Sequence, residues 1–216
     1  MAATIITVAQ QKGGAGKTTL AANLAIAYAQ ANKKVAVADI DPQRSLTMWH
    51  TLRQTLHGEH SGITVVPVGG WKLATELDRL RRDHDIVVID SPPHAETDAR
   101  IAVRQAQLVV IPVQPSPLDV WATEPILAVA QKEKAPVLLV LNRVPPRANL
   151  IDEMMLEIEE SFLKSGGARI ADSRIGNRVA FAGAMLKGLG VTELEPKGRA
   201  AQEIRALGRE ILKAAG

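Results

Sequence analysis

The chain alternates between short, continuously apolar runs and longer stretches whose apolar residues recur at helical spacing. The apolar runs are rich in Val, Ile and Leu and occupy residues 4–9, 35–38, 63–66, 86–89, 108–111 and 137–141. Continuous apolar runs suit strands that are covered on both faces, as in parallel sheets. The pattern therefore predicts an α/β fold, a mostly parallel twisted sheet with helices on both faces and ligands beyond the carboxyl ends of its strands.

The length of 216 residues and the hydrophobic content of 46% are enough to bury a substantial core. No internal repeat, low-complexity tract or flexible linker divides the sequence, so residues 1–216 are predicted to form a single domain. The sequence has no window of about 18 uninterrupted apolar residues and no secretory signal pattern at its N-terminus. We therefore expect a cytoplasmic protein without a membrane partner.

The first apolar run leads into a glycine-rich turn and then a helix that carries Leu20 and Leu24 at helical spacing. Glycines allow backbone conformations that a Cβ would block, so successive N–H groups can converge on a phosphate at the positive end of the helix. Lys17 adds a charge near the β- and γ-phosphates, and the Thr18 hydroxyl is placed to ligate Mg²⁺. The sequence predicts a nucleoside triphosphate site formed by Gly13, Gly14, Ala15, Gly16, Lys17, Thr18 and Thr19.

Carboxylates follow two of the other predicted strands. Asp39 and Asp41 come directly after the second run, on the same side of an extended chain, and Asp90 ends the fourth. A carboxylate at a rigid strand end can hold the Mg²⁺ shell, usually through water, which is the role predicted for Asp90. Two alternatives remain open: the aspartate pair could cap the next helix, and Asp90 could be a turn residue.

Three motifs point to one family. The segment KGGAGKTT resembles the deviant Walker A motif of the ParA/MinD family of P-loop ATPases, with Gln11 where the standard pattern has glycine and with a second lysine, Lys12. The segment from Asp39 to Gln43 is similar to the family's Walker A′ motif. Asp90, followed shortly by two prolines, is similar to its Walker B motif.

The resemblance assigns roles to individual residues. It implies that Lys12 reaches across a dimer interface to the partner's nucleotide, while Lys17 acts in its own site. It also implies that Asp41 orients or activates the attacking water and that Asp39 supports the Mg²⁺ shell held by Thr18 and Asp90. Lys12, Lys17 and Asp41 are thus the predicted catalytic residues.

A proline-rich loop at residues 111–119 looks similar to that of the small, ParF-like plasmid-partition ATPases. In those proteins the loop lies near the adenine and the dimer interface, which makes Pro115 a candidate nucleotide contact. Asn142, with Arg143 beside it, resembles the family's adenine-side asparagine. A stiff connection and an ordinary turn remain the alternatives for these two segments.

Composition narrows the function further. The chain has no cysteine, which excludes nitrogenase iron proteins and iron–sulfur carrier ATPases, two classes with a similar loop. The histidines show no zinc-site spacing. Trp49, Trp71 and Trp121 form no aromatic ladder for bases and are predicted to pack in the interior.

The basic excess is C-terminal, because residues 164–216 carry ten Lys or Arg against five Asp or Glu. We predict an acidic amphipathic helix at residues 151–163 and a second helix opening at residue 173. In that second helix, Arg174 and Arg178 would share one face, and the inward-facing residues would be Val179, Phe181, Ala182, Met185 and Leu186. By analogy with ParA-like proteins, the predicted contacts to non-specific DNA are Lys164, Arg169, Arg174, Arg178 and Lys187. An ordinary solvated face is the alternative.

The last predicted helix, residues 200–214, bears on membrane binding. Its large apolar residues are Ile204, Leu207, Ile211 and Leu212, and it has no aromatic residue. MinD-like members instead end in an amphipathic helix with bulky apolar residues and lysines that lies on the bilayer. We therefore expect this helix to pack on the sheet.

These features together favour a ParA-type, Mg²⁺-dependent ATPase that hydrolyses ATP to ADP and phosphate. The resemblance implies an ATP-dependent homodimer, binding to nucleoid DNA and a ParB-like adaptor protein that stimulates hydrolysis. The expected function is to position or segregate a plasmid, chromosome or cytoplasmic protein cluster over the nucleoid. The alternatives are a MinD-like division regulator and a metabolic ligase of the dethiobiotin synthetase type.

Overall fold

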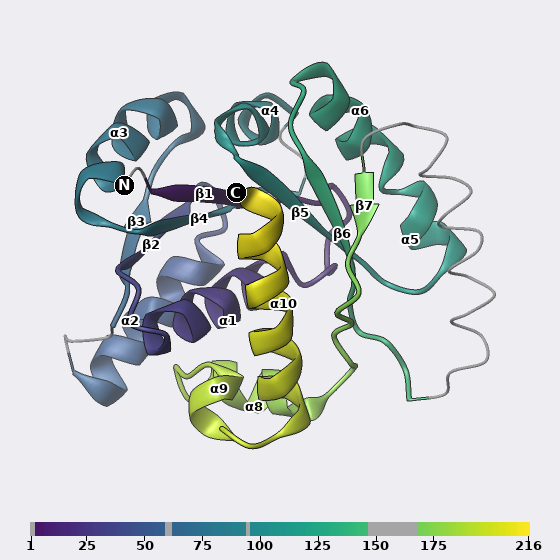
Figure 1. Ribbon diagram of the computed structural model, residues 1–216. Coiled ribbons are helices and arrows are strands. Elements are labelled where there is room, and N and C mark those ends of the chain that lie inside the picture. Colours follow the sequence, from purple (N-terminus) through teal and green to yellow (C-terminus); the bar gives the residue numbers. More distant parts are fainter. Residues whose placement is uncertain (1–2, 59–61, 94–95, 147–167) are drawn as a thin grey trace.

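The computed structural model describes residues 3–58, 62–93, 96–146 and 168–216, and a seven-stranded sheet lies at its centre (Figure 1). All strand pairings within these residues are parallel, in the order β3-β2-β4-β1-β5-β6-β7. The strands are β1 Thr4–Val8, β2 Val35–Asp39, β3 Thr64–Pro67, β4 Ile86–Asp90, β5 Leu108–Val113, β6 Val137–Leu141 and β7 Ala168–Ile170. The predicted α/β fold is confirmed, and the six apolar runs are the first six strands.

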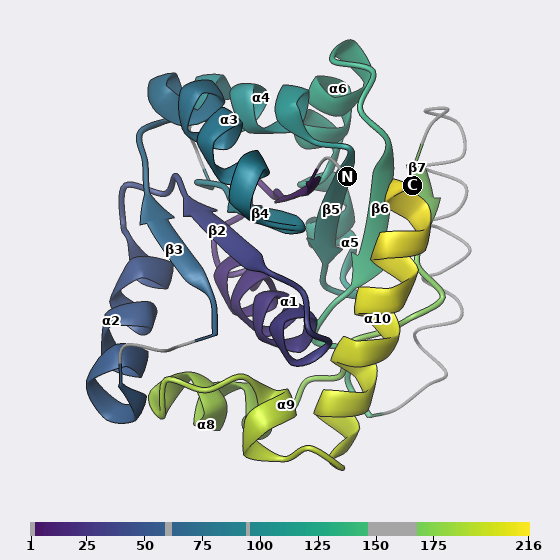
Figure 2. The same cartoon turned by 60° about the vertical axis from the view of Figure 1, so that its left-hand side comes forward.

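Helices cover the sheet in two groups. Figures 1 and 2 show α1, α2 and the C-terminal helices on one face and α3, α4 and α6 on the other. The helices on the first face are α1 Lys17–Gln30, α2 Ser45–His57, α8 Val179–Leu186, α9 Val191–Leu194 and α10 Arg199–Ala215. The remaining helical segments are η1 Gly70–Lys72, α3 Leu73–Asp83, α4 Glu96–Gln105, α5 Pro117–Trp121 and α6 Glu124–Lys132.

The sheet separates two layers of apolar core. Successive side chains of β1 point to opposite faces, so Ile6 joins the cluster under α1 and α10, whereas Ile5 joins the cluster under α3. Every residue of β2, β4, β5 and β6 is buried. Burial on both faces explains why these strands appear in the sequence as continuous apolar runs.

Register brings the predicted acidic residues to one edge of the sheet. Asp90 at the end of β4 lies directly opposite Val8 of β1 on one side and Asp39 of β2 on the other. Because all of these strands run parallel, the loops after β1, β2, β4, β5 and β6 all leave the sheet at the carboxyl ends of its strands, which we call the carboxyl edge. The glycine-rich loop follows β1, which lies between β4 and β5 in the sheet. The strands that follow β1 in sequence are added on both sides of it, so the strand order reverses here. Open α/β sheets bind their ligands at such a point.

The C-terminal helix packs as predicted. Ile204, Leu207 and Ile211 of α10 are fully buried in the core cluster that also contains α1. None of the described helices is both long and apolar enough to span a bilayer.

Two predictions for the C-terminal third are wrong. The helix expected to open at residue 173 begins at Val179, because the segment before it runs beside the chain that follows β6. There, the Ile175 amide donates to the Leu141 carbonyl and the Asn177 amide donates to the Val144 carbonyl. Residues 174 and 178 therefore do not share a helix face. Strand β7, which adds the seventh strand, was not predicted at all.

The orientation of α8 also differs from the prediction. Val179 and Leu186 are 87% and 78% exposed, and Ala182 is exposed as well, so these three do not face inward. Phe181 and Met185 do pack against the core. At helical spacing, residues 179, 182 and 186 lie on one side of α8 and residues 181 and 185 on the opposite side, so the core covers only one of the two sets. The helix predicted at residues 151–163 lies outside the described residues.

The tryptophans divide in a similar way. Trp49 is buried as predicted, at 5% exposure, but Trp71 and Trp121 are 79% and 62% exposed, which contradicts the packing role predicted for them. Trp71 lies in the short η1 helix, where the Lys72 ammonium sits 4.6 Å from its ring centre. Composition could not show that both residues belong to short helices at the surface, Trp71 to η1 and Trp121 to α5.

Candidate functional site

The glycine-rich loop between β1 and α1 forms the floor of the site. Gly14 and Gly16 have φ angles of 77° and 89°, in the left-handed region that favours glycine. A Cβ on Gly16 would also lie 2.6 Å from Asn142 Nδ2. Gly16 is the N-cap of α1 and supplies no side-chain cap, so amide groups in the first turn stay available for an anion. The predicted phosphate cradle thus has a physical basis in the backbone.

Lys17 is held inside this loop. Only 7% of the residue is exposed, and burial lowers the pKa of its ammonium while the charges of Asp90 and Asp41 oppose that shift. A buried cation with buried carboxylates nearby is suited to bind a polyanion that would enter between them.

Asp90 is the least satisfied group at this edge. Burial, with help from Asp39 and Asp41, raises the pKa of its carboxyl to about 7, although Thr18 and Lys17 oppose the shift. Neither carboxylate oxygen has a hydrogen-bond partner of good geometry among the described residues. A divalent cation held by Asp90 and the Thr18 hydroxyl would satisfy these oxygens. The residues present therefore fit Mg²⁺.

The described residues contain no cluster of three or more metal-ligating His, Cys, Asp or Glu side chains. Such a cluster is not expected for Mg²⁺, which is commonly bound through one or two carboxylates together with water and substrate phosphates.

Asp39 and Asp41 are already engaged in hydrogen bonds. The Asp39 carboxylate accepts from the amide and hydroxyl of Thr47, at 3.0 and 2.6 Å, and from the Asp41 amide at 3.2 Å. Asp41 accepts from the Gln43 amide at 2.9 Å through one oxygen. Asp39 thus fixes the start of α2, in keeping with a supporting role, while Asp41 keeps an oxygen for another partner. Their parts in metal and water binding stay predictions.

Lys12 has a partner that the sequence did not reveal. Its ammonium lies 2.8 Å from Asp119 Oδ2, and Asp119 is 6% exposed whereas the Lys12 side chain is 37% exposed. The Gln10 side chain accepts from the Lys12 amide and donates to the Thr123 hydroxyl, which in turn donates to the Asp119 carbonyl. The proline-rich loop is therefore tied to the start of the phosphate loop through α5. No spacing rule links residues so far apart in sequence.

A cavity of about 490 Å³ opens beside the phosphate loop. Gly16, Thr19, Asn142 and Arg143 line its loop side, and α8 lines the opposite side with Phe181. The Asn142 side chain donates to the Ala15 carbonyl at 2.8 Å and accepts from the Arg143 amide at 3.0 Å, so it is partly engaged in shaping the loop. Arg143 is exposed with a φ of 55°.

The cavity has the size and position for a nucleoside. The predicted adenine-side residues Asn142 and Arg143 meet there, but Pro115 is not among the described residues that line it. Its nucleotide contact stays a prediction.

The predicted DNA-binding residues are scattered. Arg169 lies on β7, Arg174 on the segment before α8, and Lys187 at the end of α8, and all three are exposed. Arg178 forms an ion pair with Glu203 that raises the pKa of its guanidinium, and it lines the cavity beside the phosphate loop. Lys164 lies outside the described residues.

Comparison with known proteins places this geometry in context. Residues 6–191 match the family model described as the CobQ/CobB/MinD/ParA nucleotide binding domain. The chain is 29% identical to the maintenance of carboxysome distribution protein A of Halothiobacillus neapolitanus, over 96% of this chain and 95% of that one. It is 28% identical to the chromosome-partitioning ATPase Soj of Thermus thermophilus, over 96% and 94%.

Solved structures support the fold. The McdA(D38A)–ATP complex from Cyanothece aligns with a TM-score of 0.77 at 20% identity, covering 98% of this chain and 96% of that one. The septum site-determining protein MinD of Pyrococcus horikoshii, complexed with Mg-ADP, aligns with a TM-score of 0.76 at 21% identity, covering 99% and 98%.

Proposed function

Because the chain belongs to the CobQ/CobB/MinD/ParA nucleotide-binding family, we propose that it is an ATP-hydrolysing dimerisation switch that positions a cargo in the cell. The observation that carries this proposal is the difference between its two loop lysines. Lys17 is buried near Asp41 and Asp90 in its own site. Lys12 comes before the glycines of the loop, has a side chain more than a third exposed, and is held by Asp119.

Hydrolysis would use the residues of the carboxyl edge. The loop amides and Lys17 would hold the phosphates, and Asp41 would orient a water whose oxygen attacks the γ-phosphorus as the bond to the ADP oxygen breaks. The products are ADP, inorganic phosphate and a proton. Thr18 and Asp90 would hold Mg²⁺, which supplies charge neutralisation on the phosphate oxygens.

The switch would depend on Lys12. To reach the nucleotide of a second copy, its ammonium must leave Asp119, so dimer formation and release of this ion pair would be coupled. Two nucleotides between the monomers would stabilise the dimer, and hydrolysis would release it.

The cargo proposal rests on the relatives. One named relative acts in carboxysome distribution and another in chromosome partitioning, both of which concern spatial distribution. We propose the same class of task here, in the cytoplasm, with non-specific DNA of the nucleoid as the support. An adaptor protein would select the cargo and stimulate hydrolysis.

Light scattering coupled to size exclusion tests the switch. Wild type, Lys12→Ala and Asp41→Ala would each be measured with ADP or ATP and Mg²⁺, with the exposed Lys33→Ala as the matched control. We expect ATP to make wild type and Lys33→Ala dimerise, Asp41→Ala to form a long-lived dimer, and Lys12→Ala to stay monomeric. Monomers throughout, with wild type still hydrolysing ATP, would contradict the trans role of Lys12.

The same samples separate the metabolic alternative. A ligase of the dethiobiotin synthetase type needs a small-molecule acceptor, whereas a positioning ATPase releases phosphate from ATP and Mg²⁺ alone. Phosphate release that requires an added acceptor would favour the ligase.

A further inference from the structure

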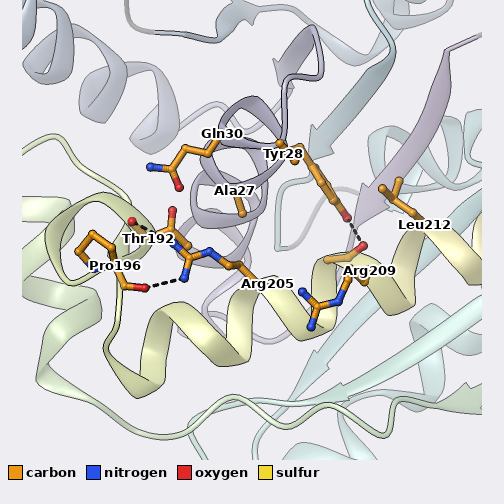
Figure 3. Close-up of a pocket in the computed structure, with 10 residues that line it drawn as sticks. Ala27, Tyr28, Gln30, Thr192, Pro196, Arg205, Arg209 and Leu212 are labelled. Atoms are coloured by element: carbon orange, nitrogen blue, oxygen red, sulfur yellow. Dashed lines mark hydrogen bonds between the residues drawn. The ribbon is translucent and has the colours of Figure 1, made fainter.

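A second hollow, which we call the α1–α10 groove, lies between the last turns of α1 and the middle of α10 (Figure 3). Its volume is about 580 Å³, and small or aliphatic residues form its floor: Ala27, Gly208 and Leu212. Polar groups at its wall and rim come from Thr192, Arg205 and Arg209. The 14 residues of α1 span about 20 Å, so the groove lies well away from the phosphate loop at the other end of this helix.

The Thr192 hydroxyl indicates that a hydrogen-bond partner is missing at the groove. The residue is 1% exposed, and its hydroxyl has no hydrogen-bond partner among the described residues. Its backbone carbonyl does have one, since it accepts from Arg205 Nη2 at 3.4 Å (Figure 3). Because buried polar groups are rarely left unpaired, this hydroxyl behind the wall of the hollow marks a place where a hydrogen-bond partner is missing.

The two arginines supply positive charge beside this hydroxyl. Arg205 is anchored by its bonds to the Pro196 and Thr192 carbonyls, which use two of its five N–H donors. Arg209 stands one helical turn further along the same face and is exposed. Within the described residues, Arg209 has no acidic partner at ion-pair distance. The groove thus offers a preorganised donor and an uncompensated cation.

The apolar residues of the groove floor indicate which class of molecule carries the anion. The residues of the floor are small or aliphatic, and the ring of Tyr28 is buried, with its hydroxyl donating to the Gly208 carbonyl at 3.1 Å. Tyr28 is the aromatic residue among the described residues that line the groove, and because it is only 4% exposed its ring offers no open face to a nucleobase. The floor suits a short apolar side chain, and guanidinium groups match carboxylates in geometry.

We propose that the α1–α10 groove binds an acidic segment of a partner protein. A carboxylate of the segment lies against Thr192, Arg205 and Arg209, and a neighbouring aliphatic side chain packs on Ala27 and Leu212. The proposal goes beyond the nucleotide switch and does not need it, because the groove is complete in one monomer without nucleotide. A failed ATPase test would leave it standing.

Nuclear magnetic resonance on the full chain tests the proposal directly. The probe is the peptide acetyl-Ala-Glu-Leu-Ala-Ala-Glu-Leu-Ala-amide, with the Glu→Gln peptide as its control, titrated without nucleotide at low salt. We expect saturable shifts of the Ala31, Thr192 and Gly208 amides with the acidic peptide only. Equal binding of the Gln peptide, or shifts centred elsewhere, would overturn the proposal.

Matched variants distinguish binding in the groove from non-specific attraction of the acidic peptide to positive charge on the surface. Arg209→Glu should weaken peptide binding by about tenfold or more. Lys213→Glu makes the same charge change on the same helix, outside the groove, and should alter binding by about twofold at most, because exposed charges are screened. An equal loss in both variants would overturn the assignment.

Two further measurements test shape and ligand class. Ala27→Leu fills the floor without changing charge, so it should abolish peptide binding while thermal unfolding shows a folded protein. Unchanged binding by this variant would overturn the packing part of the proposal. Inorganic phosphate that gives the same shifts over the same concentration range would indicate a simple anion site and overturn the acidic-segment proposal.

Discussion

The carboxyl edge of the sheet and the C-terminal surface, meaning the exposed basic residues of the C-terminal third, both carry charge, but in opposite surroundings. At the edge, Lys17, Asp41 and Asp90 are buried at 7%, 8% and 1% exposure. On the C-terminal surface, Arg169, Arg174 and Lys187 are exposed. Burying a charge is costly unless something compensates it, whereas an exposed charge costs little. The edge is therefore strong evidence for a ligand, and the surface is weak evidence for one.

Asp90→Asn should give the largest effect. Losing the carboxylate should lower ATP hydrolysis by about a hundredfold or more, because the charge that holds Mg²⁺ is gone. Phosphate release measures this, with the exposed Asp83→Asn as the control. Hydrolysis that survives in Asp90→Asn would remove Asp90 from the site.

The same variant makes a prediction about stability in EDTA without nucleotide. Burial raises the pKa of Asp90 from 3.8 to about 7, so its charged form is disfavoured in the folded state. The free energy of unfolding of the wild type should therefore fall as the pH rises from about 4 through 7. It should fall less in Asp90→Asn, which has no carboxyl group to ionise at this position. Thermal unfolding against pH would show this; identical profiles would contradict it.

Asp119→Asn should give a moderate effect. The ion pair with Lys12 is partly exposed and worth about 1 kcal/mol, so freeing the lysine should favour the ATP dimer by about fivefold. Light scattering over a concentration series measures the midpoint of dimerisation, with Asp78→Asn, which breaks an exposed helical pair, as the control. An unchanged midpoint would mean that the Lys12 pair does not oppose dimerisation.

Lys187→Ala and Arg178→Ala should give the smallest effects. When a lysine or arginine that contacts one DNA phosphate is removed, the slope of log DNA affinity against log salt concentration becomes less steep by about one unit. We expect this change for Lys187→Ala. Arg178 is engaged with Glu203, so its removal should change the slope less. A fluorescence titration with duplex DNA at several salt concentrations measures both. The opposite order would show that Arg178 leaves Glu203 on binding.

Local patterns determined the framework of this protein. Runs of Val, Ile and Leu become strands because burial on both faces demands it, and Gly14 and Gly16 adopt left-handed backbone that a side chain would strain. Asp90 could be placed at a strand end because it directly follows one of these apolar runs. These features depend on neighbours in sequence, which a pattern can show.

Only the tertiary structure decided which distant groups meet. The pairs Lys12–Asp119 and Arg178–Glu203, and the contact of Thr192 with Arg205, join residues that no periodicity connects. Apolar periodicity likewise predicted an inward face for α8, but whether a neighbouring element covers that face depends on how the chain returns to the sheet. Sequence thus determined the first six strands, the glycine-rich loop and the acidic edge, because these follow from local backbone and burial rules. The partners of the charges depend on packing between remote segments, so only the fold could decide them.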